Sequence, residues 1–333
     1  MNKSTAQILA AICWILLATQ LIPAQVNPAI LPHDEINNWG RWGQDDERGA
    51  ANYMTPEAIV KAAALITKGK TFSLAIPIDE AGPRIPSRRP PHHFMVSTGV
   101  DVAVGPNPNS SAVRFTDDYI YMPLQGSTQW DGLPHAFYGG KFYNGFPLES
   151  VRTAGARRLG LENVKDSFVG RGVLIDIVSY KGGSLDTGYG ISRADIEGAL
   201  TKQGVEIHEG DIVILRTGEV PAYYGMNSGE RARWHLSQTG IVKDVIPWIR
   251  ETRIAAIAAD NLAIERSPNP DRRNYNLHGN ILRDMGVYIG ELWTVEELAA
   301  DCAEDGRYEF FICAPPLHIP GAVGSPLNPI AIK

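Results

Sequence analysis

The sequence predicts a single α/β domain. Strand-like apolar runs (173–178, 212–215 and 254–259) alternate with helix-like segments (192–203 and 241–250). Hydrophobic residues make up 44% and charged residues 20% of the 333 residues, which is typical of a globular protein. The sequence contains no internal repeat, and no linker divides it into two domains.

Two helix starts have clear sequence signals. Thr55 is an N-cap before Pro56 at the first helical position, and Gly69 closes that element. Ser192 and Asp195 form a capping box for a helix that runs to about Gln203.

The N-terminus has the pattern of a secretory signal peptide. Residues 8–22 are almost entirely apolar, and Pro23-Ala24 offers a cleavage site. We therefore predict a signal peptide over 1–24, a mature domain over 25–333, and a secreted or periplasmic location. The alternative is an uncleaved anchor; no later segment is apolar and long enough to cross a membrane.

Net charge bears on the possible binding partners, and cysteine content bears on a possible disulfide. A net charge of −6 provides no basic surface, so we expect no nucleic-acid partner. Cys302 and Cys313 are the only cysteines after the predicted cleavage site, and they could form a bridge or remain as buried thiols.

One glycine-rich segment, 125–135, contains an unusual concentration of polar side chains. It reads Gln125-Gly-Ser-Thr-Gln-Trp-Asp-Gly-Leu-Pro-His135, and its Gly and Pro residues argue against a helix. Asp131 and His135, with Gln125 and Gln129, could converge on one ligand or ion. The alternative is an ordinary loop with a capping Asp and a surface His.

A second pair of candidate residues lies near the C-terminus. His278 opens an expected helix over 278–285 that Gly286 ends, and Glu291 ends an expected strand over 287–291. Thr294 and Glu297 fit a capping box for the next helix, which gives Glu297 a structural role and leaves Glu291 without one. His278 could instead only start its helix.

Segment 125–135 resembles the signature His-x-Gly-Thr-His-x-Asp-x-Pro-x-His of the metal-dependent cyclase/kynurenine-formamidase-like hydrolase family. Thr128, Asp131 and His135 match it, whereas Gln125 and Gln129 stand where the family has metal-binding histidines. Segments 37–49, 277–292 and 315–329 also resemble the family. The resemblance implies a swivelling β/β/α fold around a mixed sheet and a homodimer or larger assembly.

The resemblance also implies a chemistry. One divalent metal ion, Mn or Zn, would activate a water that attacks a small amide, formamide, cyclic imide or lactone. The implied metal ligands are Asp131, His278 and Glu291, with Gln125 and Gln129 as weak ones, and His135 is the implied general base. Substrate would contact the neighbouring aromatic residues Trp130, Phe137 and Tyr138.

Two other functions fit the same residues. Without metal, His135 and Asp131 form an acid/base pair suited to an isomerase, lyase or cyclisation catalyst. A secreted binding protein with a vestigial site is the other. No serine nucleophile elbow, phosphate-binding loop or dinucleotide fingerprint is present in the sequence.

The segment 79–118 is rich in Pro, Gly, Arg and Ser and includes His92 and His93. It could be a lid whose Arg or His side chains meet an anionic substrate. It could equally be an arm that contacts another subunit.

Overall fold

The computed structural model describes residues 36–105, 111–269 and 277–333. The predicted signal peptide over 1–24 therefore lies outside the described residues. No helix within the described ranges is long and apolar enough to cross a membrane.

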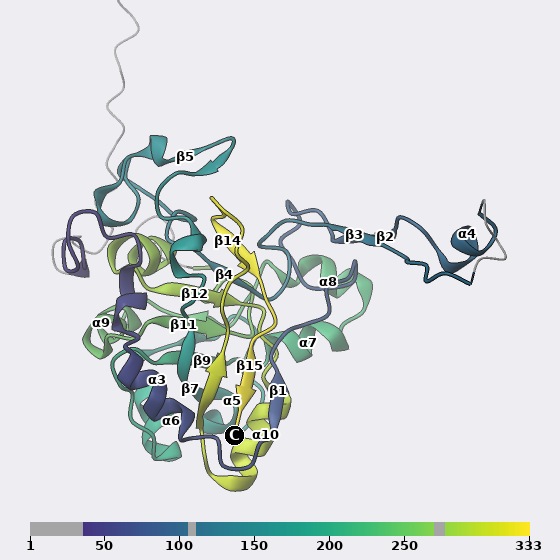
Figure 1. Ribbon diagram of the computed structural model, residues 1–333. Helices are drawn as coiled ribbons and strands as arrows, with labels where there is room; N and C mark the ends of the chain where they lie inside the picture. The colour runs from purple at the N-terminus through teal and green to yellow at the C-terminus, as the bar shows by residue number, and fades with distance from the viewer. Residues whose placement is uncertain (1–35, 106–110, 270–276) are drawn as a thin grey trace, which may run out of the picture.

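A mixed nine-stranded sheet forms the centre of the molecule (Figure 1). Its order is β1-β15-β13-β7-β9-β11-β12-β4-β14, and β7, β9, β11 and β12 are parallel to their neighbours within that group. The remaining pairs are antiparallel. In chain order the strands are β1 Thr71–Ser73, β4 Gln129–Asp131, β7 Val169–Asp176, β9 Ile212–Arg216, β11 Ala256–Ala259, β12 Tyr288–Glu291, β13 Glu309–Cys313, β14 Gly324–Pro326 and β15 Ile330–Ile332.

Helices cover both faces of this sheet. On one face the core contains apolar residues of α6 (Arg193–Gln203) and α9 (Val245–Thr252), and on the other it contains those of α10 (Glu296–Asp305). Along β9, Val213 and Leu215 face the first core while Ile212 and Ile214 face the second, because side chains alternate along a strand. The predicted α/β class is confirmed.

Shorter elements surround this core. The helices are α3 Pro56–Ala63, α4 Gly99–Ala103, α5 Ile177–Lys181, α7 Glu219–Gly225 and α8 Ser228–Trp234. The small two-stranded pairs are β2 His92–Met95 with β3 Asp118–Tyr121, β5 Val151–Arg152 with β6 Gly155–Ala156, and β8 Gly190–Ile191 with β10 Gly240–Ile241.

Local signals predicted several boundaries correctly. Helix α6 has the Ser192–Asp195 capping box and ends at Gly204 in the left-handed conformation. Helix α3 has the predicted Thr55 as its N-cap, but it ends at Ala63, before the predicted Gly69. The expected Thr294–Glu297 box is wrong: α10 begins at Glu296 after Val295, and the Thr294 amide donates to the Leu74 carbonyl. This backbone hydrogen bond to Leu74, the residue after β1, fixes the position of Thr294, so Thr294 does not cap α10. Cys302 and Cys313 are both free thiols.

The segment predicted as a loop over 125–135 contains a strand. Residues 129–131 form β4 because two antiparallel neighbours, β12 and β14, pair with them. The segment expected to be a helix over 278–285 is a π-helical turn, Gly279–Asp284, in which the Met285 amide donates to the Asn280 carbonyl at 3.1 Å.

Gly290 on β12 is required by close packing. A Cβ there would lie 2.6 Å from the Ala258 Cβ and 2.9 Å from atoms of both Trp130 and Trp293. Those two indoles pack edge to face with their centroids 4.8 Å apart. The strand that carries Glu291 can therefore lie against this pair only with glycine at 290.

We expect Gly290→Ala to lower the free energy of unfolding by about 1–3 kcal/mol, because overpacking forces neighbouring groups to shift. Urea unfolding of the variant measures this. Gly225→Ala is the matched control, since a Cβ at that position would meet nothing within 4 Å; its expected change is within about 0.5 kcal/mol. Equal stability of the two variants would contradict the packing argument.

Candidate metal centre and active site

The pairing of β4 with β12 brings the two halves of the predicted site together. Gln129 lies opposite Glu291 in the antiparallel register, and Asp131 lies two residues farther along β4 on the same face. Both carboxylates are buried. Residues separated by 160 positions along the chain thus meet on two adjacent strands inside the sheet.

His278, at the start of the π-helical turn, completes this group. Its Nε2 lies 3.2 Å from Glu291 Oε1 and 3.9 Å from Asp131 Oδ2. Its Nδ1 lies 2.8 Å from the carboxylate of Glu265. A carboxylate on the second ring nitrogen is the arrangement that orients a metal-binding histidine.

These residues fit a divalent metal ion. One ligand atom from each of Asp131, His278 and Glu291 lies within 4.8 Å of the others. Asp131 Oδ2 is buried and has no hydrogen-bond partner among the described residues, so an acceptor is aimed into this space unsatisfied. Two carboxylates and one imidazole match the preferences of Zn²⁺ or Mn²⁺.

The two glutamines lie at the site in different ways. The Gln129 side-chain amide donates to Asp131 at 3.1 Å and to Glu291 at 2.8 Å, so its nitrogen, not its oxygen, faces the carboxylates. The Gln125 side-chain nitrogen is buried without a partner in the part of the chain that is described, and its backbone carbonyl accepts from Arg88 at 2.6 Å. Their role as weak metal ligands stays a prediction.

His135 lies beside the same carboxylate, with its Nε2 3.7 Å from Asp131 Oδ2. Burial lowers the pKa of His135 below its usual 6.5, and the nearby His278 lowers it further, although Asp131 acts in the opposite direction. The imidazole of His135 is therefore neutral at neutral pH and can accept a proton.

Asp131 and His278 have pKa values shifted upward in the metal-free protein. Burial, followed by the charge of Glu291, raises the pKa of Asp131 to about 6. Burial acts to lower the pKa of His278, but hydrogen bonds to Glu265 and Glu291 outweigh it and raise that pKa well above 6.5. A bound cation would compete with the proton on His278.

A cavity of about 800 Å³ adjoins this group through His135 and His278, which form part of its lining. His135, His278 and the half-exposed Phe137 line it, as do several side chains that sequence reasoning missed: His235, Gln238, Glu265 and Arg266. No local pattern marked these four, because their positions depend on how segments 235–238 and 265–269 pair across the fold.

Two of the predicted substrate contacts, Trp130 and Tyr138, do not line this cavity. Trp130 is fully buried on the opposite face of β4 and donates to the Ala314 carbonyl, since residue 130 must point away from 129 and 131. Tyr138 is absent from the cavity lining and donates to Asp284 at 2.5 Å, with the Arg283 guanidinium over its ring. Phe137 lines the cavity, and its contact with substrate stays a prediction.

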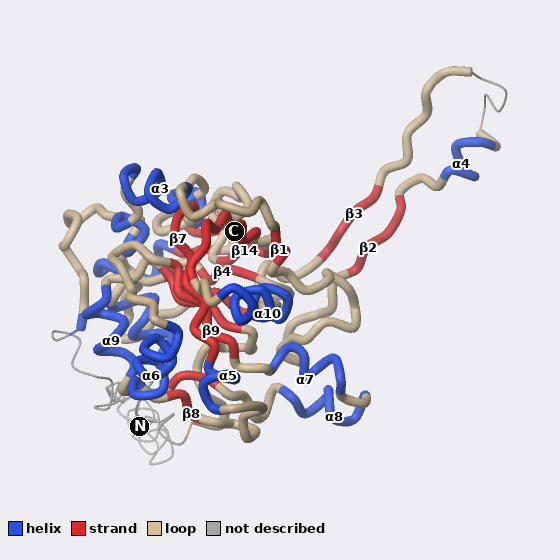
Figure 2. The backbone as a smooth tube through the Cα atoms, turned by 90° about the horizontal axis from the view of Figure 1, so that it is seen from below, coloured by secondary structure: helices blue, strands red, loops and turns tan. Residues whose placement is uncertain are grey.

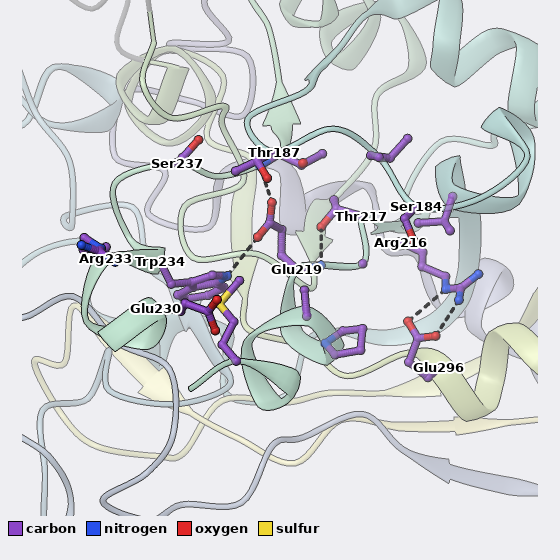
Figure 3. A pocket seen from close by; sticks show the side chains of 17 residues that line it. Ser184, Thr187, Arg216, Thr217, Glu219, Glu230, Arg233, Trp234, Ser237 and Glu296 are labelled. Atoms are coloured by element: carbon purple, nitrogen blue, oxygen red, sulfur yellow. Dashed lines mark hydrogen bonds and ion pairs between the residues drawn. The ribbon is translucent and has the colours of Figure 1, made fainter. Parts of the chain in front are cut away.

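A second cavity, of about 540 Å³, lies near the ends of β7 and β9 (Figure 3). Its buried Glu219 accepts from the Trp234 indole at 3.0 Å and the Thr239 amide at 2.6 Å. Arg216 in turn pairs with Glu296 at 2.5 Å. Within the described part of the chain, no residue lining this cavity has a buried side-chain acceptor without a partner, in contrast to Asp131 of the candidate metal group.

We expect Asp131→Asn to stabilise the metal-free protein at pH 8. The pKa of Asp131, about 6 in the folded chain, exceeds the value of about 3.9 in an unfolded chain. The folded state therefore loses stability as the pH rises from about 4 through about 6. The expected gain for the variant is on the order of 2 kcal/mol at pH 8 and smaller near pH 5.

Unfolding in the presence of a chelator at the two pH values measures this gain. Asp186→Asn is the control, because that side chain is exposed and should give no pH-dependent difference. A gain for Asp131→Asn that is the same at both pH values would contradict the upward pKa shift.

Comparison with known proteins identifies the family. Residues 72–266 match the cyclase family model, described as "Putative cyclase". A crystal structure of a novel cyclase is 60% identical, covers 92% of this chain and 100% of its own, and has a TM-score of 0.87. No curated protein matches the sequence significantly.

More distant structures share the fold. Isatin hydrolase A from Labrenzia aggregata is 17% identical over 81% of this chain and 94% of its own, with a TM-score of 0.55. Isatin hydrolase A from Ralstonia solanacearum is 15% identical over 84% and 98%, with a TM-score of 0.56. The predicted cyclase-like fold is confirmed, and the chain belongs to the cyclase family.

Proposed function

We propose that this protein is a metal-dependent hydrolase of a small amide, formamide, cyclic imide or lactone. The observation that carries the proposal is the convergence of Asp131, His278 and Glu291 beside a cavity, with one carboxylate oxygen unsatisfied. Family membership and the hydrolase names of two structural neighbours are consistent with it.

The three residues would hold one divalent ion, Mn or Zn. When bound, such an ion acts as a Lewis acid and lowers the pKa of water from about 15.7 toward about 7. Glu265 fixes the orientation of His278 through the 2.8 Å contact to its Nδ1. Gln129 holds the two carboxylates together by donating to both.

His135 is suited to move the proton. It is neutral at neutral pH, lines the cavity and lies 3.7 Å from Asp131. It would accept a proton from the attacking water and return it to the leaving amine or alkoxide. The amide nitrogen of Gln125, which has no partner among the residues that the structure describes, is a candidate donor to the oxyanion that develops on the carbonyl.

One observation favours the metal-independent alternative. His135 and Asp131 lie close together, and their pKa values are shifted toward each other, downward for His135 and upward for Asp131. Such a pair could exchange protons with a carbonyl compound near neutral pH without metal, as an isomerase, lyase or cyclisation catalyst does.

Chelation should abolish turnover, and Zn²⁺ or Mn²⁺ should restore it. A panel of small amides, formamides, cyclic imides and lactones provides the assay, and elemental analysis gives the metal content. Zn²⁺ at a hundred times its Kd should also stabilise the protein by about 2.7 kcal/mol.

Glu291→Gln and His278→Gln should reduce bound metal, whereas the exposed His208→Gln should not. Metal-free protein with chelator-insensitive turnover would favour the acid/base alternative.

His135→Ala should lower kcat by about a hundredfold to ten-thousandfold while metal content is retained, because a proton acceptor is lost but no ligand is. Steady-state kinetics on metal-loaded protein measure this, with His208→Ala as the control. An unchanged kcat would remove His135 from the mechanism. Tight ligand binding without turnover in the unmodified protein would instead indicate a binding protein with a vestigial site.

A further inference from the structure

Arg266 lines the cavity beside the candidate metal group and has a cationic side chain without a partner. Its Nε is buried and has no hydrogen-bond partner within the described ranges. Its guanidinium also forms no ion pair with any residue that the structure describes. A partly buried cation in this state is costly, because its N–H donors lose water without gaining an acceptor.

Other arginines with largely buried side chains have carboxylate partners. Three of them contact a carboxylate at 2.5–2.6 Å: Arg171 with Asp211, Arg216 with Glu296, and Arg283 with Asp284. Glu265, next to Arg266 in the chain, is the only carboxylate among the described residues that line the cavity. Its oxygen lies 2.8 Å from His278 Nδ1, so this carboxylate already has another partner.

The neighbouring strands fix the position of Arg266. Its backbone amide donates to the Ile241 carbonyl at 3.1 Å. A Cβ at Gly240 would lie 2.7 Å from the Arg266 backbone nitrogen, and one at Gly190 would lie 3.4 Å from its Nη1. Glycines on β8 and β10 thus allow Arg266 to lie close against both strands. Its place is set by the fold before any ligand binds, which lowers the cost of binding.

The lining of the cavity suits an anionic group attached to an apolar body. Its titratable side chains are His135, His235, Glu265, Arg266 and His278. The His235 ring, like the Arg266 guanidinium, forms no hydrogen bond with the described part of the chain. Several other lining residues are apolar: Ile85, Phe137, Leu236, Leu262 and Pro268. Nitrogen donors therefore outnumber acceptors in a partly apolar pocket, which favours an anionic ligand.

We propose that Arg266 binds a carboxylate of the substrate, so that the enzyme acts on small amides, formamides, cyclic imides or lactones that bear a separate carboxylate. This inference rests on the proposed function and adds a substrate class to it. A planar guanidinium donates two parallel hydrogen bonds to the two oxygens of a carboxylate. We call this position the carboxylate subsite.

A phosphate group fits the same position less well. Phosphate carries more charge and is usually bound by a cluster of cations. The described lining of the cavity contains one arginine and no lysine. A single guanidinium, with the His235 ring as a further donor, matches a group of one negative charge.

The carboxylate subsite lies close to the candidate metal group. Arg266 directly follows Glu265, which contacts the candidate metal ligand His278, and all three residues line one cavity. Adjacent Cα atoms in a chain are about 3.8 Å apart. A small molecule held by its carboxylate at Arg266 can therefore extend along the apolar lining toward the metal group. Such remote binding orients the carbonyl that reacts.

Calorimetric titration of the full chain with a chelator present tests the subsite separately from catalysis. The probes are phenylacetate and phenylacetamide, which have nearly the same shape and differ in charge. Phenylacetate should bind about tenfold to hundredfold more tightly, as expected for charge-assisted hydrogen bonds. Arg266→Gln should remove this preference, whereas Arg250→Gln, at an exposed position, should retain it.

Turnover by the metal-loaded protein tests the substrate class. The substrates are formanilide and a ring-carboxylated formanilide. The carboxylated compound should have the lower KM, and Arg266→Gln should raise KM for that compound alone, because the lost contact acts on binding. If neither compound is turned over but the calorimetric preference depends on Arg266, the hydrolase function is wrong and the carboxylate subsite is supported.

Three results would overturn the proposal: equal binding of phenylacetate and phenylacetamide by the unmodified chain, a preference for phenylacetate that survives in Arg266→Gln, or its equal loss in Arg250→Gln. Should Arg266→Gln fail to fold, NMR of the unmodified chain decides. Phenylacetate should shift the Arg266 Nε–H resonance and slow its exchange with water. An unchanged resonance at saturating phenylacetate would contradict binding at this residue.

Discussion

The site depends on two carboxylates buried next to each other. Asp131 and Glu291 come from adjacent antiparallel strands and have little access to water, a placement that like charges resist. The chain offsets part of this repulsion with the Gln129 amide, which donates to both, and with His278. One oxygen of Asp131 has no hydrogen-bond partner within the described ranges, and a cation would contribute most there. The electrostatic strain and the proposed metal affinity are thus two consequences of one arrangement.

Other charged side chains at the carboxyl ends of the parallel strands have structural roles. Of the parallel strands, β7 ends at Asp176 and β9 at Arg216, and these two pair at 3.1 Å. Asp260, after β11, accepts from the amides of Thr217 and Gly218 and so fixes the start of α7. Ligand sites in α/β sheets lie where parallel strands end. Here the charges at the ends of β7, β9 and β11 make structural contacts, whereas β12 ends at Glu291, which belongs to the candidate metal group.

The region 79–125 has two parts: a base beside the candidate site, and the exposed pair of strands β2 and β3. The segment was open to two interpretations, a lid or an arm, and its described part projects away from the body (Figure 2). Arg88 and Gln125 remain at its base beside the site. The exposed aromatic side chains Phe94, Tyr119 and Tyr121 lie farther out, on β2 and β3.

Local sequence by itself determined the class, several helix ends and the candidate site. Capping residues act within three or four positions, so both ends of α6 could be predicted from the sequence. Segment 125–135, His278 and Glu291 were found through residue chemistry and family resemblance. The tertiary structure decided which side of β4 each residue faces, which removed Trp130 from the cavity, and it supplied Glu265, His235 and Arg266. The tertiary structure also showed that Thr294 does not cap α10. These outcomes depend on contacts between segments far apart in sequence, where strand pairing and close packing, not local preference, set the positions of side chains.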